Sequence, residues 1–241
     1  MRKTLFSALL VLFTLVMTTA VYAAADRFTL EERMAMGDDY LMRGRADLAL
    51  QEYNAALAIN PACTMAHNNR SVIFSLYGMF DKALEAADKA VAAEPKNFLA
   101  YMNRGNALTG LGRHKEALAA YDKAVGLYPG AAAAHLFRAN ALLNLGRYEE
   151  ACKSADKAVS LWPDNPMGCY IKGVGLCCQG KDREAVLALS DSAKMDPTFP
   201  DVFNRLAEVM DHMGRKDDAK AFRDKAKQAE SACVKESGTL M

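Results

Sequence analysis

The sequence predicts an all-α fold, an α-solenoid of six antiparallel helix pairs, and three regularities support that prediction. Five prolines recur every 34 residues without one deviation, and a strict period of this length marks stacked supersecondary units. With each proline at position 32 of a unit, position 15 is Gly and position 20 is Ala in all six units. The prolines are Pro61, Pro95, Pro129, Pro163 and Pro197, and the units span 30–63, 64–97, 98–131, 132–165, 166–199 and 200–233.

Each repeated column has a physical cause. Glycine adopts a left-handed turn without steric penalty, so position 15 ends the first helix of each unit and the chain reverses there. Small residues at positions 8 and 20 let the two helices of a unit approach closely. Position 11 lies three residues beyond position 8 on the same helical face, and we expect it to form a core column of Tyr40, Phe74, Leu108, Leu142, Leu176 and Met210.

One stretch of the third unit resembles a known repeat family. Tyr101-Met102-Asn103-Arg104-Gly105-Asn106-Ala107-Leu108, followed by Gly112 and Ala117, is close to the tetratricopeptide repeat (TPR) consensus. The resemblance covers 30–233 and implies a right-handed superhelix with a concave face built from the first helices. Position 4, often Trp in that family, is Arg33, His67, Tyr101, His135, Cys169 and Phe203, so we expect uneven packing at this column.

Both ends of the array have the features of caps. Thr29 and Glu32 fit a capping box that starts the first helix. In the sixth unit, positions that elsewhere are mostly apolar become Lys220, Arg223 and Lys227, which indicates a last helix facing solvent. Residues 234–241 are expected to form a frayed tail.

The N-terminal residues have the layout of a targeting segment. Arg2 and Lys3 precede an uncharged run over 4–25 that ends in small residues, which predicts a secretory signal at 1–23. Cleavage before Ala24 is preferred, and cleavage before Asp26 is the alternative. Because the uncharged run reaches the ~20 residues that span a bilayer, an uncleaved membrane anchor over 4–25 remains open. We expect export, most simply to the bacterial periplasm, with no membrane insertion after cleavage.

Charge and motifs exclude several classes of function. Thirty Lys and Arg stand against 29 Asp and Glu, so the chain lacks the field that drives non-specific binding to nucleic acid. The sequence has no phosphate-binding Gly loop, no nucleophile elbow and no HExxH motif. We therefore expect a protein that is not an enzyme, with no catalytic residue and no cofactor.

The resemblance implies that positions 2, 5, 6, 9, 12 and 13 of the first helices line the concave groove. Apolar residues there, several of them Met, suit a docked peptide or helix, and Asn amides can hold an extended backbone. Ordinary solvated helix surface is the alternative for the Asn residues. The predicted groove residues are Met65, Asn68, Asn69, Val72, Leu99, Met102, Asn103, Asn106, Leu136, Asn140, Met167 and Tyr170.

Charged residues give weaker indications. Glu31, Asp38, Asp201, Glu208 and Asp211 make the ends of the groove acidic, which suits a basic partner segment or simply a solvated end. Position 7 holds Arg70, Arg104, Arg138 and Lys172, which we expect to pack their stems between helices with the charges at the surface. The Asp-Lys pairs are expected on a solvated outer face, and they begin at Asp88, Asp122, Asp156 and Asp224.

Six cysteines allow a second hypothesis. Cys63 and Cys233 are five units apart, too far for one disulfide. Cys152 could approach Cys178 and form a disulfide, and the alternative is that these two residues are small buried hydrophobes without a bond. Cys177, Cys178, Asp211 and His212 occupy positions 12 and 13 of neighbouring units, where four metal ligands could converge. A redox or metal-binding protein is therefore the alternative function.

The favoured function is a non-catalytic interaction scaffold. It would bind a peptide or helix of a protein partner in the concave groove and assist assembly of an envelope or secreted complex. Self-association through the groove is a variant of this hypothesis. The sequence does not identify the partner.

Overall fold

The computed structural model describes residues 28–238, and the side chains of 28–231. This part of the chain consists of twelve α-helices without strands. The first helices of the six units are α2 (Leu30–Met42), α4 (Thr64–Leu76), α6 (Phe98–Gly110), α8 (Ala132–Asn144), α10 (Pro166–Cys178) and α12 (Pro200–His212). The second helices are α3 (Ala46–Ile59), α5 (Phe80–Ala93), α7 (His114–Leu127), α9 (Tyr148–Leu161), α11 (Asp182–Met195) and α13 (Lys216–Gly238).

The predicted targeting segment 1–23, and the alternative anchor over 4–25, lie outside the described residues. The last helix extends past residue 233 to Gly238, and 239–241 also lie outside the described part. Among the helices from α2 to α13, none combines the length and the apolar character needed to cross a bilayer.

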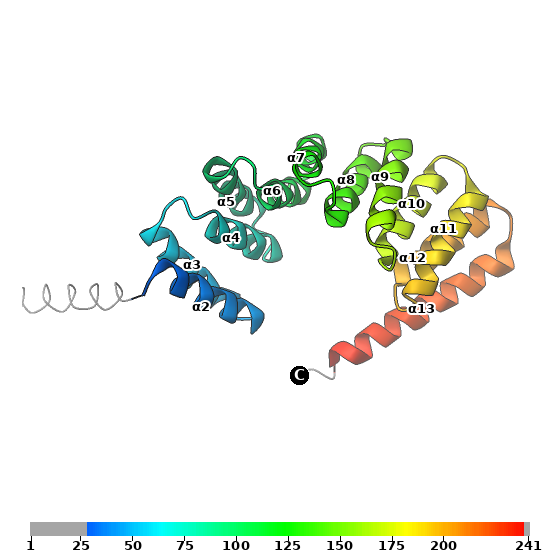
Figure 1. The fold of residues 1–241 in the computed structure, drawn as a ribbon. Coiled ribbons are helices and arrows are strands. Elements are labelled where there is room, and N and C mark those ends of the chain that lie inside the picture. Colours follow the sequence, from blue (N-terminus) through cyan, green and yellow to red (C-terminus); the bar gives the residue numbers. More distant parts are fainter. Residues whose placement is uncertain (1–27, 239–241) are drawn as a thin grey trace, which may run out of the picture.

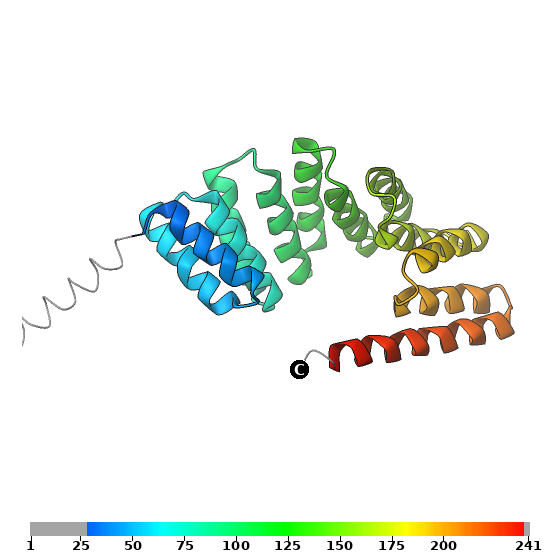
Figure 2. The same ribbon diagram turned by 60° about the horizontal axis from the view of Figure 1, so that its bottom comes forward.

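The helix pairs follow one another along a curved path and form an arch (Figure 1). Consecutive helices pack against each other within each unit and across each unit junction. In Figure 1, α4, α6 and α8 lie on the inner side of the arch and α5 and α7 on its outer side; the turned view in Figure 2 shows the same order of units. The predicted all-α solenoid of antiparallel pairs is confirmed.

Capping residues set the ends of these helices. The glycine at position 15 of every unit has positive φ, from 68° at Gly78 to 77° at Gly214, which reverses the chain after each first helix. No other residue in the described part has positive φ. The capping box at Thr29 is present: the Thr29 side chain accepts from Glu32 N, and the Glu32 carboxylate accepts from Thr29 N at 2.7 Å. These predictions from the sequence are confirmed.

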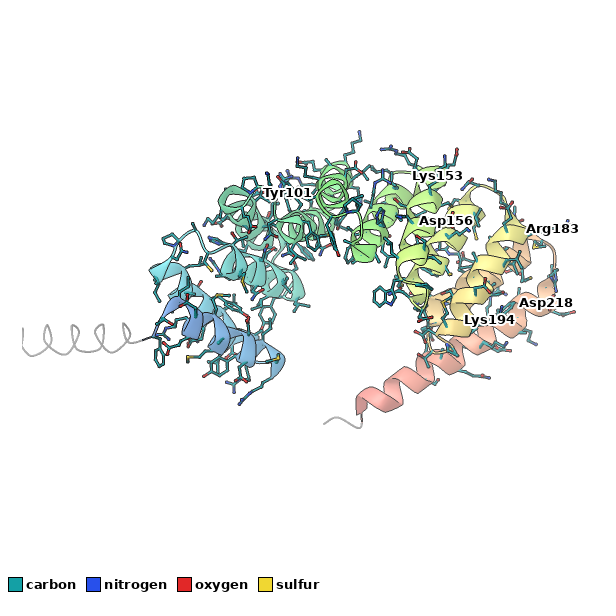
Figure 3. The ribbon with its side chains drawn as sticks, viewed as in Figure 1. Tyr101, Lys153, Asp156, Arg183, Lys194 and Asp218 are labelled. Atoms are coloured by element: carbon teal, nitrogen blue, oxygen red, sulfur yellow. The ribbon has the colours of Figure 1, made fainter. Side chains whose placement is uncertain are left out.

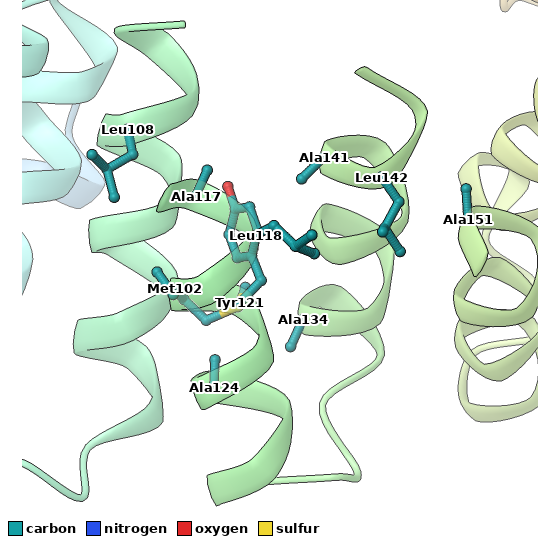
Figure 4. Packing of buried hydrophobic residues seen from close by; sticks show 11 residues of the cluster. Met102, Leu108, Ala117, Leu118, Tyr121, Ala124, Ala134, Ala141, Leu142 and Ala151 are labelled. Atoms are coloured by element: carbon teal, nitrogen blue, oxygen red, sulfur yellow. The ribbon is translucent and has the colours of Figure 1, made fainter. Parts of the chain in front are cut away.

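The alanine column forms the spine of the core. All six Ala residues at position 20, from Ala49 to Ala219, are fully buried. Position 11 is buried from the third unit onward, beginning with Leu108, and Figure 4 shows Leu108 near Ala117 and Tyr121 in the central cluster. Tyr40 and Phe74 are only half-buried, so the core column is complete in four of the six units.

A second packing rule links position 8 to position 24. A Cβ built on Gly105 would lie 2.4 Å from Cε1 of Tyr121, so the ring occupies the space a side chain would need. The same contact joins Gly37 to Tyr53 and Gly173 to Leu189. In units two and four, where position 8 carries a side chain, position 24 is small: Ser71 occurs with Ala87, and Ala139 with Ala155. Unit six departs from this rule, with Ala207 and Arg223. Volume is thus exchanged between the two helices in units one to five.

Ion pairs connect neighbouring units along the outer helices. The position-7 cation of one unit bonds the position-25 carboxylate of the preceding unit at three junctions: Arg104 to Asp88 at 2.7 Å, Arg138 to Asp122 at 2.6 Å, and Lys172 to Asp156 at 2.7 Å. These carboxylates remain about half exposed, as expected for a solvated surface, and they also bridge units. At the last junction both partners change, to Leu206 and Ser190.

The position-4 histidine of unit two lies under the proline turn that precedes it. His67 is buried, and its Nε2–H donates to the carbonyl oxygen of Pro61 at 2.9 Å. Its Nδ1 is buried without a hydrogen-bond partner in the described part of the chain. Burial is the main cause that lowers the pKa of His67 below its ordinary value of 6.5, and the bond to Pro61 partly opposes it.

This histidine makes the fold sensitive to acid. As the pH falls below 6.5, the unfolded chain binds a proton at His67 before the folded chain does, so the free energy of unfolding decreases until the pH passes the lowered folded pKa. His67→Tyr, the residue type at position 4 of unit three, should make that decrease smaller. Urea unfolding at about pH 7.5 and pH 5.5 measures it. If the parent and His67→Tyr lost the same free energy of unfolding between the two pH values, the acid sensitivity would not come from His67.

Candidate functional site

The structure separates the predicted groove residues by burial. Met65, Val72, Leu99 and Met167 are well exposed, whereas Asn68 and Met102 are only 7% and 6% exposed. Met102 reaches toward Tyr121 inside the central core (Figure 4), because its long unbranched side chain fills the space beside that ring. The expectation that Asn68 and Met102 offer groove surface is wrong.

Several groove amides already have partners within the protein. Nδ2 of Asn69 donates to Oδ1 of Asp38 at 3.0 Å, and the same oxygen accepts from the Tyr53 hydroxyl at 2.6 Å. Burial, the hydrogen bond to Asp38 and its charge raise the pKa of Tyr53. Nδ2 of Asn103 donates to Oδ1 of Asn68 at 3.2 Å. These bonds join unit one to unit two and unit two to unit three, so they stabilise the stacking of units.

The amide of Asn106 is also engaged. Its Oδ1 accepts from the Tyr121 hydroxyl at 2.8 Å, and burial raises the pKa of Tyr121 to about 12. The side chain of Asn140, by contrast, is exposed and forms no hydrogen bond within the described residues. Of the five predicted groove amides, Asn140 is therefore the one best placed to bond a partner.

The acidic ends of the groove are partly neutralised. Glu208 pairs with Arg205 at 2.6 Å, and Asp211 pairs with Arg223, whereas Asp38 accepts hydrogen bonds from the neutral Tyr53 and Asn69. Glu31 and Asp201 are exposed on the first turns of α2 and α12. Two of the five carboxylates thus have a cationic partner, which reduces the negative charge offered to a basic segment.

Two apolar areas remain on the first helices. One lies on units one to three, where Met65 and Leu99 are 60% and 51% exposed, together with Met42 and Leu76, which the prediction does not include. The other is a pocket of about 590 Å³ between α8 and α10. It gathers four of the predicted residues: Leu136, Asn140, Met167 and Tyr170.

Aromatic residues that the prediction does not include complete this pocket. Phe137, at position 6 of α8, stacks against Tyr121 at 5.8 Å between ring centroids and remains 40% exposed. Trp162 caps the end of α9 and is 49% exposed at the pocket wall. Trp162 lies at position 31, in the turn between units, so a survey of first helices alone does not find it.

The floor of the pocket is fixed by neighbouring structure. Tyr170 packs against Phe199 with ring centroids 4.9 Å apart, and Asn165 caps α10 by accepting from Met167 N at 2.9 Å. Arg205 is the single charged residue among those that line the pocket. The arrangement is a preformed apolar surface with one cation and exposed amides at its edge.

The residues of the alternative metal hypothesis do not come together. His212 Nδ1 lies 2.7 Å from a carboxylate oxygen of Asp182, and Asp211 pairs with Arg223 instead of turning toward the cysteines. Within the described residues, no group of three His, Cys, Asp or Glu side chains is placed to hold a metal ion. Separate ionic partners thus keep the two unit-six residues apart from Cys177 and Cys178.

The cysteines with described side chains are free thiols: Cys63, Cys152, Cys169, Cys177 and Cys178. The bond between Cys152 and Cys178 that the sequence allows is not formed. Cys152 is buried against the backbone of α10, with its thiol 3.6 Å from the Lys172 carbonyl oxygen. Burial raises the pKa of Cys177 to about 11, so its thiol is a poor nucleophile at neutral pH.

Comparison with known proteins agrees with the resemblance to the tetratricopeptide repeat family. The tetratricopeptide repeat family model matches residues 78–132 and 111–166. No curated protein matches the sequence significantly.

Solved structures with similar folds include a tetratricopeptide repeat protein from Parabacteroides merdae (TM-score 0.70, 21% identity, covering 83% of this chain and 79% of that one). PilF of Pseudomonas aeruginosa has a TM-score of 0.70 and 20% identity, covering 80% and 88%. YrrB, described as a TPR protein with an unusual peptide-binding site, has a TM-score of 0.60 and 21% identity, covering 74% and 92%. The chain therefore has the fold of a TPR solenoid, and its central units match the tetratricopeptide repeat family model.

Proposed function

We propose that the chain is a non-catalytic scaffold that binds a peptide or helix of a protein partner in the pocket between α8 and α10. The exposed trio of Phe137, Trp162 and Met167 carries this proposal, because large apolar side chains gathered in a concave pocket indicate a surface that a partner covers. TPR proteins generally mediate protein–protein interactions. YrrB, which has a similar fold, is described as having a peptide-binding site, and a peptide is the class of partner proposed here.

The lining residues favour a particular kind of segment. An apolar anchor side chain would bury the aromatic surface, and Asn140 at the edge would bond a backbone amide or carbonyl of the segment. Arg205, the only charged residue among the lining residues, already pairs with Glu208 at 2.6 Å, so the anchor and not a charge beside it would supply most of the affinity.

We further propose that residues 1–23 direct export and that the partner belongs to an envelope or secreted complex. The basic start, the uncharged run and the small residues before Ala24 support this. Mass spectrometry of the protein isolated from its native cells would give the N-terminal residue. A mature chain that begins at Ala24 or Asp26 is expected, and a chain that retains Arg2 and Lys3 would contradict cleavage.

Affinity capture with paired variants tests the site. The chain from Ala24 to Met241 would be compared with Phe137→Ala/Met167→Ala in the pocket and with Met65→Ala/Leu99→Ala on the first apolar area. All four residues are exposed, so both double variants should fold, which circular dichroism checks. We expect a partner held by the parent and by the second variant, and lost from the first.

The outcome that contradicts the proposal is equally specific. Loss of the partner from Met65→Ala/Leu99→Ala, with full retention by the pocket variant, would place binding on units two and three. Equal capture by all three chains would remove both apolar areas from consideration.

A further inference from the structure

The junction of units five and six lacks the ion pair found at the three central junctions, and a second cavity lies there. At the three central junctions a cation at position 7 meets a carboxylate at position 25, as in the pair between Lys172 and Asp156. At the junction of units five and six these positions are Leu206 and Ser190. Both line a cavity of about 560 Å³ between α11, α12 and α13. The paired replacement thus removes two charges and leaves an apolar depression that shares no lining residue with the aromatic pocket.

The cavity has an apolar floor and a basic edge. Phe203 and Leu206 of α12 and Phe222 of α13 supply the floor, and Lys194 of α11 and Lys225 of α13 stand at the edge. Figure 3 shows Lys194 on α11 close to the C-terminal pair of helices. Lys194 pairs with Asp191 at 2.9 Å, on the surface. Lys225 lies over the Phe222 ring and pairs with no carboxylate in the part of the chain whose side chains are described.

We infer that this cavity binds a medium-chain carboxylate, an acyl chain with an ionised head group. Its lining runs along α13 from Phe222 to Ala229, two helical turns or about 10 Å, which matches a chain of about eight carbons. The floor side chains offer no hydrogen-bonding group, so an extended peptide backbone laid on them would lose its bonds to water, whereas an acyl chain has none to lose. The carboxylate would lie beside the ammonium of Lys225.

Calorimetric titration of the chain from Ala24 to Met241 with hexanoate, octanoate and decanoate, kept below their micelle concentrations, tests the inference. We expect one site per chain, with affinity rising about fourfold for each methylene that the floor buries and levelling off once the trough is filled. Decyltrimethylammonium, with the same chain and the opposite charge, should bind at least tenfold more weakly than decanoate.

The chain offers a matched variant that removes the cavity. Ser190→Asp with Leu206→Arg installs the ion pair present at the three central junctions, so we expect it to fold and to lose at least tenfold in decanoate affinity. Lys225→Gln, which leaves the floor intact, should lose about threefold, the effect of one exposed charge pair. Phe137→Ala/Met167→Ala should bind decanoate as the parent does, which separates this site from the protein-binding pocket.

Any one of three results would overturn the inference. The first is that the parent shows no saturable binding of decanoate. The second is that the variant with the installed ion pair binds decanoate as tightly as the parent, and the third is that decyltrimethylammonium binds as tightly as decanoate. If the installed pair prevented folding, Lys225→Gln and the comparison of the two head groups would still decide the question.

Discussion

Gly105→Ala is expected to destabilise the solenoid by about 1–3 kcal/mol, although alanine is the better helix former. The added Cβ would lie 2.4 Å from the Tyr121 ring. That ring is 2% exposed and its hydroxyl bonds to Asn106, so it has no room to move aside. Urea unfolding followed by circular dichroism measures the change in the free energy of unfolding.

The same contact predicts a compensating pair. Tyr121→Ala alone should cost about 3–5 kcal/mol because it leaves a cavity. Gly105→Ala with Tyr121→Ala recreates the pair that Ala139 and Ala155 form in unit four, so the double variant should cost less than the sum of the single changes by more than about 1 kcal/mol.

Gly126→Ala in α7 is the control, because a Cβ there meets nothing within 4 Å. This change should be neutral or stabilise the fold by up to about 1 kcal/mol. If Gly105→Ala changed the free energy of unfolding no more than Gly126→Ala does, the proposed exchange of volume between positions 8 and 24 would be contradicted.

Phe137→Ala is expected to weaken binding of the partner by about 30-fold or more, the effect of losing a buried aromatic anchor worth about 2 kcal/mol. The protein has one Trp, Trp162, and it stands in the pocket wall, so its emission reports on occupancy of the pocket directly. Titrating the captured partner while following this emission gives the affinity of each variant.

Val72→Ala provides the matched comparison. Val72 is 39% exposed, nearly the same as Phe137 at 40%, but it lies on α4, and the pocket is lined from α8 onward. We expect less than a twofold change in affinity for it. A larger loss for Val72→Ala than for Phe137→Ala would move the binding site to the first apolar area.

The sequence columns predict the fold well because each column reports a local constraint. The left-handed backbone at position 15 requires Gly, and the close helix packing at position 20 requires Ala. Both requirements repeat with the 34-residue period. The pairing of Gly105 with Tyr121 is harder to find, because position 8 is small in every unit and position 24, which fills the space beside it, varies from Ala to Tyr.

The site is predicted less completely, because exposure depends on neighbours outside the column. Met102 and Met167 both lie on first helices, yet Met102 fills space beside Tyr121 and Met167 lines a pocket. Asn69 and Asn103 have the residue type suited to a peptide backbone, but their amides bond Asp38 and Asn68 of the preceding unit. Trp162 enters the pocket from a turn, where the groove positions of the family do not extend.

Site-specific photo-crosslinking tests the central claim, that the pocket between α8 and α10 holds the partner, most directly. A benzophenone amino acid would replace Met167 in the pocket of one chain and Leu99 on α6 in another; both positions are exposed and lie on first helices. Each chain would be irradiated with the captured partner, and the products would be mapped by mass spectrometry. We expect a crosslink to one defined segment of the partner from position 167 and little product from position 99. A crosslink from position 99 with none from position 167 would contradict the account.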